Sequence, residues 1–457
     1  NFPGIGGSIK NRATDFFVQE VPLYEPTGVG EHVYCEIQKV GIPTFEAIER
    51  IASALRVSPR DIGYAGLKDA KAITRQIFSI LGTTEEAVMT LRVPDITIQW
   101  AARHGNKLRL GHLVGNRFAI KIRDVNPTDV VKIEPVMAEL GRRGMPNYFG
   151  EQRFGRRGDN HKLGGALIRG RPEELLALLL GSPDPSIDDP PMLKARRSFS
   201  EGRFEDAMRQ WPRHGGMERR VLARMIKTGK AGAAVRMIDQ RLRRLWVSAL
   251  QSEIFNDVLS RRMTGSSPLE GEAPAEPFSG LSKGAALTAR GERPPLGIDR
   301  ILTGDLAMKH ENGAVFRVED PAAEQPRADR FEISPTGPIV GHRMTLPEGE
   351  ELNLEEQVLK SHGLTLGHFR QESRNQSPGA RRAFRVQPKD VNLAAGVDEH
   401  GAHITVAFTL PAGSYATVLL RELMKNDAPE ALSAAGEAVS AGDDEGAHAE
   451  HGEDQAE

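Results

Sequence analysis

The sequence contains at residues 62–80 the stretch IGYAGLKDAKAITRQIFSI, in which two apolar runs flank a polar loop. Residues 62–64 begin a short strand that leads into a loop punctuated by glycine. Residues 72–80 predict a second strand because they are rich in apolar and β-branched side chains. Asp69 lies in the connection between the two strands, where a rigid sheet can present a polar group. The stretch therefore predicts a domain built on a sheet, with Asp69 presented from one of its loops.

The carboxylate of Asp69 has basic neighbours in the sequence, namely Lys68, Lys71 and Arg75. Nearby cations favour the ionised form of a carboxylate, and an ionised carboxylate can act as a nucleophile or a base. The same charges could instead form a surface salt bridge that closes the loop. The charge pattern by itself leaves both interpretations open.

Mixed secondary structure is expected on both sides of this stretch. Upstream, a helix begins with Thr44 as its N-cap and ends before Pro59. Downstream, residues 173–263 are mostly helical, strands return after residue 298, and a helix starts near Ser414 as its N-cap. The remaining expected strands cover residues 15–21, 32–37, 96–102, 107–111 and 117–123, and a further helix covers residues 128–141.

Two further segments combine aromatic, polar and glycine residues. Residues 147–157 read NYFGEQRFGRR, in which rings alternate with amide and guanidinium groups. Single-stranded RNA bases are held by such groups, stacked on rings or guanidinium planes and hydrogen-bonded at their edges, although an ordinary turn with core aromatics fits equally well. Residues 408–417 read FTLPAGSYAT and, taken alone, indicate a strand, a turn and a helix start.

The charge of the chain is unevenly distributed. The net charge of the 457 residues is -2, but residues 427–457 hold ten of the 62 acidic residues and no Lys or Arg. Residues 1–426 therefore carry 60 basic against 52 acidic residues, a net charge of +8. Clustered arginines in residues 141–172 and 194–246 indicate a polyanionic partner, because arginine neutralises phosphates and binds their oxygens in pairs. Charge alone also fits a solvated helix face.

Several classes of protein are disfavoured by what the sequence lacks. It has no Walker A motif, no paired-histidine zinc helix and no nucleophile-elbow serine, so we expect neither a cofactor nor a metal site. No apolar run reaches the roughly 18 residues of a membrane span, and we expect no secretory signal because residues 1–30 show no basic-then-apolar pattern. Cys35 is the single cysteine, which excludes an intramolecular disulfide and indicates the reducing cytoplasm.

The three segments together resemble the TruD family of tRNA pseudouridine synthases. The resemblance extends over most of residues 8–425, with the motifs in the order of the family. The matching strings are GLKD at 66–69, NYFG at 147–150, QRFG at 152–155, LPAGSYAT at 410–417 and REL at 421–423, together with Lys10, DF at 15–16, RH at 103–104, KLRLG at 107–111, GN at 115–116 and ARR at 380–382.

This resemblance implies a role for each matched residue. Asp69 stands at the position of the catalytic aspartate of the family. Family members often have Phe at the position of Tyr415, whose ring keeps the stacking face. The uridine pocket and its cleft are expected to include Phe16, Asn147, Tyr415, Phe149 and Lys10. Contacts with the RNA backbone are expected from Lys68, Arg153, Arg156 and Arg157.

The resemblance also implies an α+β fold. A mixed, largely antiparallel pseudouridine synthase sheet with flanking helices is expected for a catalytic domain formed by residues 1–165 and 376–426. An inserted α/β TRUD domain is expected at residues 166–375. Within it, the Pro- and Gly-rich residues 264–297 are expected to be flexible, and the acidic residues 427–457 to form a disordered tail.

The implied function is isomerisation of a uridine in tRNA, by resemblance uridine 13, to pseudouridine without a cofactor. The enzyme would flip the nucleotide out of the RNA, and Asp69 would attack C1′ or uracil C6 or remove a proton from C2′. Two alternatives remain: an RNA-binding or RNA-chaperone protein without turnover, and a hydrolase that releases free uracil. We expect tRNA as the partner, predict no protein partner, and hypothesise that the acidic tail competes with RNA for the basic body.

Overall fold

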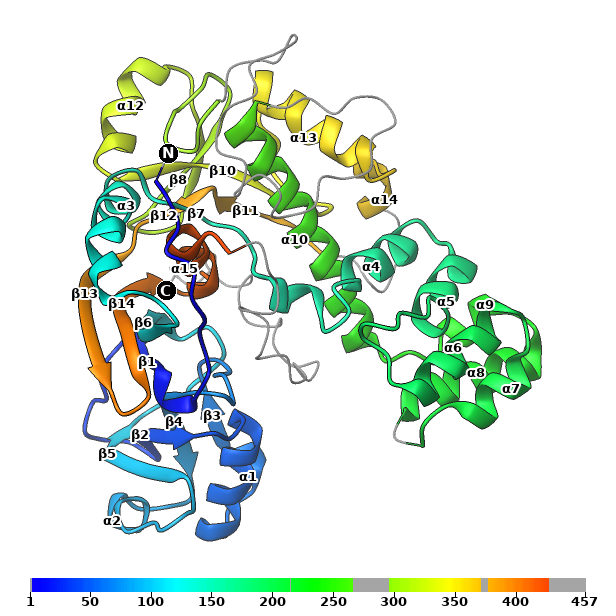
Figure 1. The fold of residues 1–457 in the computed structure, drawn as a ribbon, viewed down its shortest axis with the longest axis horizontal. Coiled ribbons are helices and arrows are strands. Elements are labelled where there is room, and N and C mark those ends of the chain that lie inside the picture. The colour runs from blue at the N-terminus through cyan, green and yellow to red at the C-terminus, as the bar shows by residue number, and fades with distance from the viewer. Residues whose placement is uncertain (1, 214, 266–295, 371–376, 427–457) are drawn as a thin grey trace, which may run out of the picture. The chain divides into compact units, whose positions relative to one another are not determined.

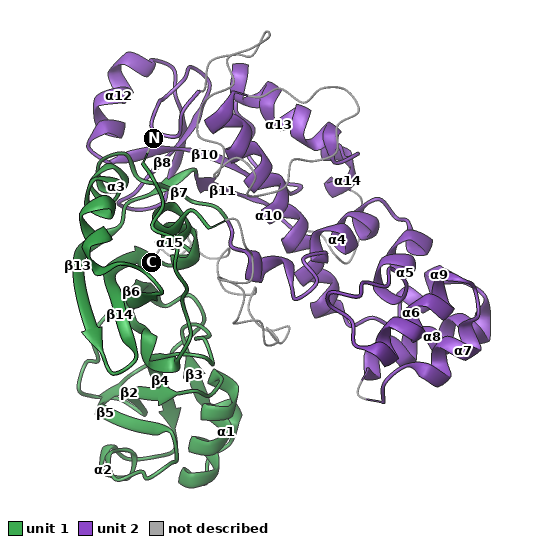
Figure 2. Ribbon diagram, in the orientation of Figure 1, with its two compact units in different colours: residues 1–148, 278–287, 384–457 green, residues 149–277, 288–383 purple. Residues whose placement is uncertain are grey.

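The computed structural model describes residues 2–213, 215–265, 296–370 and 377–426 (Figure 1). These residues form two compact units: unit 1 runs to Tyr148 and resumes at Phe384, and unit 2 runs from Phe149 to Ala383 (Figure 2). The chain thus leaves unit 1 near residue 148 and re-enters it near residue 384. The family resemblance places the inserted domain at residues 166–375. These expected domain bounds stay a prediction. Residues 266–295 of the expected flexible segment, and the expected tail, lie outside the described residues.

Unit 1 is built on an eight-stranded sheet with the strand order β13-β14-β6-β1-β4-β2-β5, in which β3 also pairs with β4. Only the β1–β4 pair is parallel, with Phe17 opposite Ile73, so the amino-terminal ends of these two strands share one edge of the sheet. The sheet strands are β1 (Phe16–Pro22), β2 (His32–Val40), β3 (Ile62–Tyr64), β4 (Ile73–Leu81), β5 (Ile96–His104), β6 (Leu113–Arg123), β13 (Lys389–Asp398) and β14 (Gly401–Pro411), and β7 (Met145–Pro146) pairs separately with β12 (Arg385–Val386).

Helices pack on this unit through apolar stripes. In α1, Ala47, Ile48 and Ile51 recur at helical spacing and pack in one core with Val33 of β2 and Phe78 of β4. The helices of unit 1 are α1 (Thr44–Leu55), α2 (Glu85–Met89), α3 (Val130–Arg143) and α15 (Ala416–Met424), with short 3-10 turns at Ala13–Asp15, Pro59–Asp61 and Pro127–Asp129.

The structure corrects three local expectations. Residues 107–111 form an irregular loop that ends in a turn rather than a strand, and Gly111 has a φ of +86°. Thr44 is the first residue of α1 rather than its cap, because its hydroxyl is engaged by Lys68 and Gln76. Ser414 does not cap α15, which begins after Tyr415. The other expected strands and helices of this unit are confirmed with small shifts at their ends.

Unit 2 contains a helical part and a small sheet. Trp211 and Trp246 lie in an apolar core with many leucines from α4 to the start of α10, which confirms that residues 173–263 are mostly helical. Its helices are α4 (Asn160–Ile168), α5 (Pro172–Leu180), α6 (Pro190–Ser200), α7 (Phe204–Gln210), α8 (Gly216–Thr228), α9 (Ala231–Val235), α10 (Gln240–Thr264), α12 (Pro321–Asp329), α13 (Gly349–Ser361) and α14 (Leu366–Arg370), with a 3-10 turn η4 at Glu151–Phe154.

The sheet of unit 2 has the order β11-β10-β8-β9 and is antiparallel at each pairing. Its strands are β8 (Leu306–Lys309), β9 (Val315–Arg317), β10 (Ile333–Ile339) and β11 (Ala380–Ala383). The fully buried Arg262 of α10 forms ion pairs with Asp305 and Glu351, so charged groups as well as apolar ones hold this unit together. The two units together confirm the α+β fold class. Among the described residues, no helix is both long and apolar enough to cross a bilayer.

Candidate active site

Buried polar side chains form hydrogen bonds to the backbone of the loop between β3 and β4. Lys39, at the end of β2, is fully buried and donates hydrogen bonds to the carbonyl oxygens of Asp69 at 2.9 Å and Ile42 at 2.7 Å. The hydroxyl of Thr44 accepts a hydrogen bond from the backbone N–H of Lys68 at 3.0 Å. Burial lowers the pKa of Lys39 to about 8, despite the opposing charge of Asp69. These bonds fix the backbone from which the Asp69 side chain projects.

The Asp69 carboxylate contacts Lys10, which lies 59 residues away in the sequence. The two charged atoms are 3.1 Å apart, and the side chain of Lys10 is 5% exposed against 23% for Asp69. The Lys10 ammonium also lies 4.4 Å from the ring centroid of Phe16, the buried first residue of β1. Because β1 and β4 are parallel neighbours, the segments that precede them meet at one sheet edge. The fold therefore brings Lys10, Phe16 and Asp69 together, three residues that the family resemblance assigns to one cleft.

Two of the cations that flank Asp69 in the sequence, Lys68 and Arg75, bind elsewhere. Lys68 forms a buried ion pair of 2.7 Å with Glu20 of β1, and Arg75 donates to the side-chain oxygen of Gln38 at 3.0 Å. Lys68 is thus better placed to neutralise Glu20 than to contact a phosphate. The cation beside Asp69 is instead Lys10, which only the pairing of β1 with β4 brings near.

Lys39 and Glu20 were not among the residues singled out from the sequence, but the strand patterns contain a signal for both. Lys39 has the same parity along β2 as the buried Val33, Cys35 and Ile37. Glu20 likewise follows Phe16 and Val18 along β1 on the buried face. Side chains two residues apart share one face of a strand. A charged residue in the apolar series of a strand is thus a candidate for a buried, functional interaction.

Asn147 and Tyr415 lie in other parts of unit 1. Asn147 is buried directly after β7, and its backbone N–H donates to the carbonyl oxygen of Phe384 at 2.9 Å. Tyr415 is half-buried and precedes α15. The end of β14 pairs with the start of β6, at the edge of the sheet opposite to the start of β1. Strand pairing alone therefore does not bring Tyr415 to Asp69.

Phe149 belongs to unit 2, where its backbone and ring are both held. Asn256 of α10 accepts from its N–H at 2.8 Å and donates to its carbonyl oxygen at 3.0 Å. The guanidinium of Arg382 lies 4.1 Å from its ring centroid. A ring stacked with a guanidinium is a surface on which a planar base can be bound.

The three arginines expected at the RNA backbone also lie in unit 2 and bind protein groups there. Arg153 donates to Ser248 and Ser252 of α10. Arg157 pairs with Asp188 at 2.5 Å and with Asp159 at 3.2 Å. Arg156 donates to the carbonyl oxygen of Ile187, between α5 and α6, but it is exposed and so is the most accessible of the three to a phosphate.

The arrangement around Asp69 suits polar chemistry on a bound group. A partly exposed carboxylate faces a buried ammonium, and an aromatic ring lies under that ammonium. Such a carboxylate can attack an electrophilic carbon or accept a proton. In the part of the chain that the structure describes, no three His, Cys, Asp or Glu side chains gather in a way that would hold a metal ion.

Comparison with known proteins gives the same family over nearly the whole chain. The family "tRNA pseudouridine synthase D (TruD)" matches residues 1–276 and 285–423. Curated relatives named tRNA pseudouridine synthase D include one from Geobacter metallireducens, 42% identical over 94% of this chain and 97% of that protein. Another, from Anaeromyxobacter sp. (strain Fw109-5), is 35% identical over 94% of this chain and 96% of that protein. A crystal structure of a Methanosarcina mazei protein that carries the TruD name superposes with a TM-score of 0.77 at 27% identity, covering 93% of this chain and 95% of that one.

Proposed function

Because the chain belongs to the TruD family of tRNA pseudouridine synthases, we propose that it converts a uridine of tRNA into pseudouridine with Asp69 as its catalytic carboxylate. The observation that carries this proposal is the contact of Asp69 with Lys10 beside Phe16, in the loop where the GLKD motif falls. By resemblance, uridine 13 is the target position. The substrate indicates a cytoplasmic enzyme.

The reaction exchanges one glycosidic bond for another. The N1–C1′ bond of the uridine breaks, the uracil turns, and a C5–C1′ bond forms; C5 then loses its proton and N1 gains one. The product is an isomer of the substrate, so no oxidant, reductant or transferred group is needed. A uracil inside folded RNA has no room to turn, and the enzyme must first extrude the nucleotide at a cost of a few kcal/mol.

Each residue around Asp69 has a proposed role in this reaction. Lys39 and Thr44 hold the loop, so that the carboxylate keeps one position while the base moves. Lys10 provides a compensating charge beside the carboxylate. Asp69 attacks C1′ or C6, or takes a proton from C2′. Phe16 is proposed to stack on the extruded base. The family resemblance assigns Phe149, Tyr415 and Asn147 to the same pocket, although strand pairing by itself does not bring Tyr415 to Asp69.

The test is replacement of Asp69 with Asn, which preserves the shape of the side chain and removes its charge. Turnover is measured as release of tritium from tRNA labelled at uracil C5, and tRNA binding is measured separately. We expect turnover to fall by at least about 10³-fold with binding retained. Unchanged turnover would contradict the role of Asp69, and release of free uracil by the wild type would indicate a hydrolase. If the wild type binds tRNA but forms no pseudouridine, the protein is an RNA-binding protein without turnover. Mapping of pseudouridines in the product tests whether uridine 13 is the target position.

A further inference from the structure

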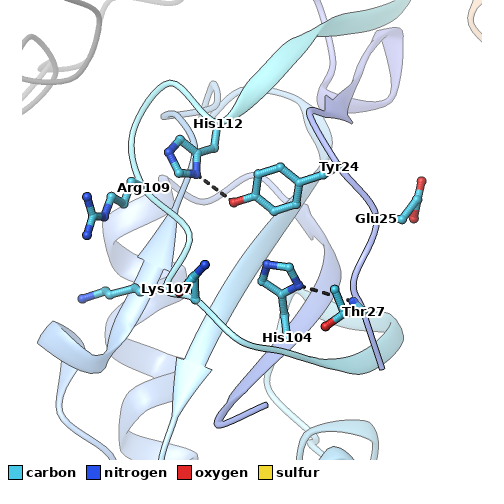
Figure 3. Close-up of a pocket in the computed structure, with 8 residues that line it drawn as sticks. Tyr24, Glu25, Thr27, His104, Lys107, Arg109 and His112 are labelled. Atoms are coloured by element: carbon cyan, nitrogen blue, oxygen red, sulfur yellow. Dashed lines mark hydrogen bonds between the residues drawn. The ribbon is translucent and has the colours of Figure 1, made fainter. Parts of the chain in front are cut away.

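Unit 1 has a cavity of about 540 Å³ whose lining includes neither Asp69 nor the residues that contact it. Figure 3 shows the lining residues. Ligand pockets of small molecules and nucleotides fall in this range of volumes. The walls come from the segment that follows β1 and from the connection between β5 and β6. The lining residues that matter here are Tyr24, Thr27, His104, Lys107, Arg109 and His112.

The cavity has a fixed aromatic side. The ring of Tyr24 stacks on that of His104 with centroids 5.2 Å apart and an interplanar angle of 17°. The Tyr24 hydroxyl is 2.8 Å from Nδ1 of His112, and the backbone N–H of Thr27 donates to Nδ1 of His104 at 3.3 Å (Figure 3). Burial, with a smaller contribution from Arg109, lowers the pKa of His112. The neutral ring can therefore accept a hydrogen bond from the Tyr24 hydroxyl. Three rings are thus locked before a ligand arrives.

The cavity also has a cationic side. Lys107 donates to the carbonyl oxygen of Arg60 at 2.5 Å, which places its charge at the wall. The side chain of Arg109 is exposed, and its guanidinium forms no hydrogen bond or ion pair with any residue that the structure describes. Glu25 is the one acidic residue in the lining, and it is exposed. A guanidinium with all its donors available is suited to a phosphate.

The cavity lies at the far end of the sheet from Asp69. Tyr24 follows the carboxyl end of β1, and His104 ends β5 at a position whose partner, His32, pairs with the last residue of β4. Asp69 precedes the first residue of β4. Eight steps along β4 at about 3.3 Å each separate the two edges by roughly 26 Å. No single nucleoside reaches both sites, but a folded RNA does.

We propose that this cavity binds one nucleotide of the tRNA substrate at a distance from the target uridine. Its base lies against the Tyr24–His104 stack, and its phosphate binds Arg109 and Lys107. This proposal rests on the proposed function, because it takes the ligand to be the same RNA. The site would fix the orientation of the tRNA on unit 1 without taking part in the chemistry.

The experiment compares Arg109→Gln with Arg92→Gln, an exposed arginine of the same unit that donates only to nearby carbonyl oxygens. Dissociation constants for full-length tRNA are measured at several salt concentrations. We expect Arg109→Gln to weaken binding about 5- to 20-fold and to reduce the slope of log K against log salt by about one, with kcat at saturation unchanged. Arg92→Gln should match the wild type.

Two further measurements separate the possible outcomes. Ultraviolet cross-linking of wild-type enzyme to tRNA should attach RNA to the peptides that contain Tyr24 or His112. Titration with AMP tests a free nucleotide as the ligand: AMP binding that depends on Arg109, together with unchanged tRNA binding by Arg109→Gln, would overturn the RNA assignment. An unchanged salt slope with no cross-link at Tyr24 or His112 would overturn the site altogether. These results do not depend on Asp69, so they are distinguishable from a failure of the proposed reaction.

Discussion

The buried ammonium of Lys39 donates a hydrogen bond to the backbone carbonyl oxygen of Asp69, 2.9 Å away. It also donates to the carbonyl oxygen of Ile42 at 2.7 Å, which ties the end of β2 to the loop. The side chain of Asp69 is thus partly exposed, while its backbone is held by a group that has no access to water. This separation lets a reactive carboxylate stay accessible on a rigid support.

Replacement of Lys39 with Met tests this support. Met fills a similar volume but removes the donor to the carbonyl oxygens of Asp69 and Ile42, and a buried acceptor left unpaired costs about 1–3 kcal/mol. We expect the Asp69 loop to shift and kcat to fall roughly 10- to 100-fold, because a small displacement of a reacting group lowers the rate strongly. The affinity for tRNA should stay within about twofold. Lys132→Met, at an exposed lysine of α3, is the control and should leave both unchanged; equal kcat in the two variants would show that Lys39 does not position Asp69.

Replacement of Lys10 with Met tests the charge next to Asp69. The change removes the ammonium that lies 3.1 Å from the carboxylate and 4.4 Å from the Phe16 ring centroid. We expect single-turnover rates to fall about 10- to 100-fold, since the carboxylate loses its compensating charge. Lys10→Arg retains a cation and should recover part of the rate. A rate for Lys10→Met equal to that of Lys10→Arg would mean that the charge has no part in the reaction.

The strand patterns predict much of unit 1, but not the contact at its centre. Alternating apolar residues are visible in β1, β2 and β4, and the stretch around Asp69 correctly predicts a loop between strands. The approach of Lys10 to Asp69 depends on the parallel pairing of β1 with β4, which brings together segments 59 residues apart. Periodicity gives the faces of a strand but not its neighbour. Only the family resemblance places Lys10 in the same cleft.

At two of the three places where local expectations were wrong, tertiary contacts decided the outcome. Residues 107–111 have the apolar spacing of a strand, but the backbone N–H of Leu108 donates to the Ser79 hydroxyl instead of joining a sheet. Thr44 has the chemistry of an N-cap, but its hydroxyl binds the loop that carries Asp69. In both cases a side chain took a partner far away in the sequence. Contacts of this kind cannot be predicted from a short segment of sequence.

The ion pair between Glu20 and Lys68 predicts strong coupling between two substitutions. Both side chains are buried, at 1% and 5% exposure, so removing one charge leaves the other uncompensated. We expect Glu20→Gln and Lys68→Met each to lower the free energy of unfolding by about 3 kcal/mol. The double variant should lose at least about 1 kcal/mol less than the sum of the two. Urea unfolding measures these values, and additive losses would contradict the pairing.

The same double variant decides whether Lys68 contacts RNA. If its charge serves only Glu20, the folded double variant should bind tRNA with the affinity and salt dependence of the wild type. A contact with a phosphate would instead reduce the slope of log K against log salt by about one. The second result would restore Lys68 to the RNA-binding surface and contradict the structural role that its geometry favours.

The buried pair of Asp15 and Arg123 predicts how the protein responds to acid. Both oxygens of Asp15 accept from Arg123, at 2.5 and 2.8 Å, and Asp398 binds the outer side of the same guanidinium. Burial alone would raise the pKa of Asp15, but the hydrogen bonds and charge of Arg123 lower it below its ordinary value. Hydrogen bonds from Arg123 and Lys121 also lower the pKa of Asp398. A carboxylate with a lowered pKa stabilises the fold above its unfolded-state pKa, and that stability is lost as the pH falls through the folded-state pKa.

We therefore expect the free energy of unfolding to decrease as the pH falls from about 5 toward 2, and to decrease less steeply in Asp15→Asn, which has no proton to take up at this position. Arg123→Met should lower stability at pH 7 by about 3–5 kcal/mol, because it leaves buried Asp15 without its cation. Urea unfolding at several pH values gives these slopes. Repetition at 0.5 M salt is the control, since added salt screens exposed charges far more than a buried pair. Parallel pH curves for the wild type and Asp15→Asn would show that this pair does not govern acid stability.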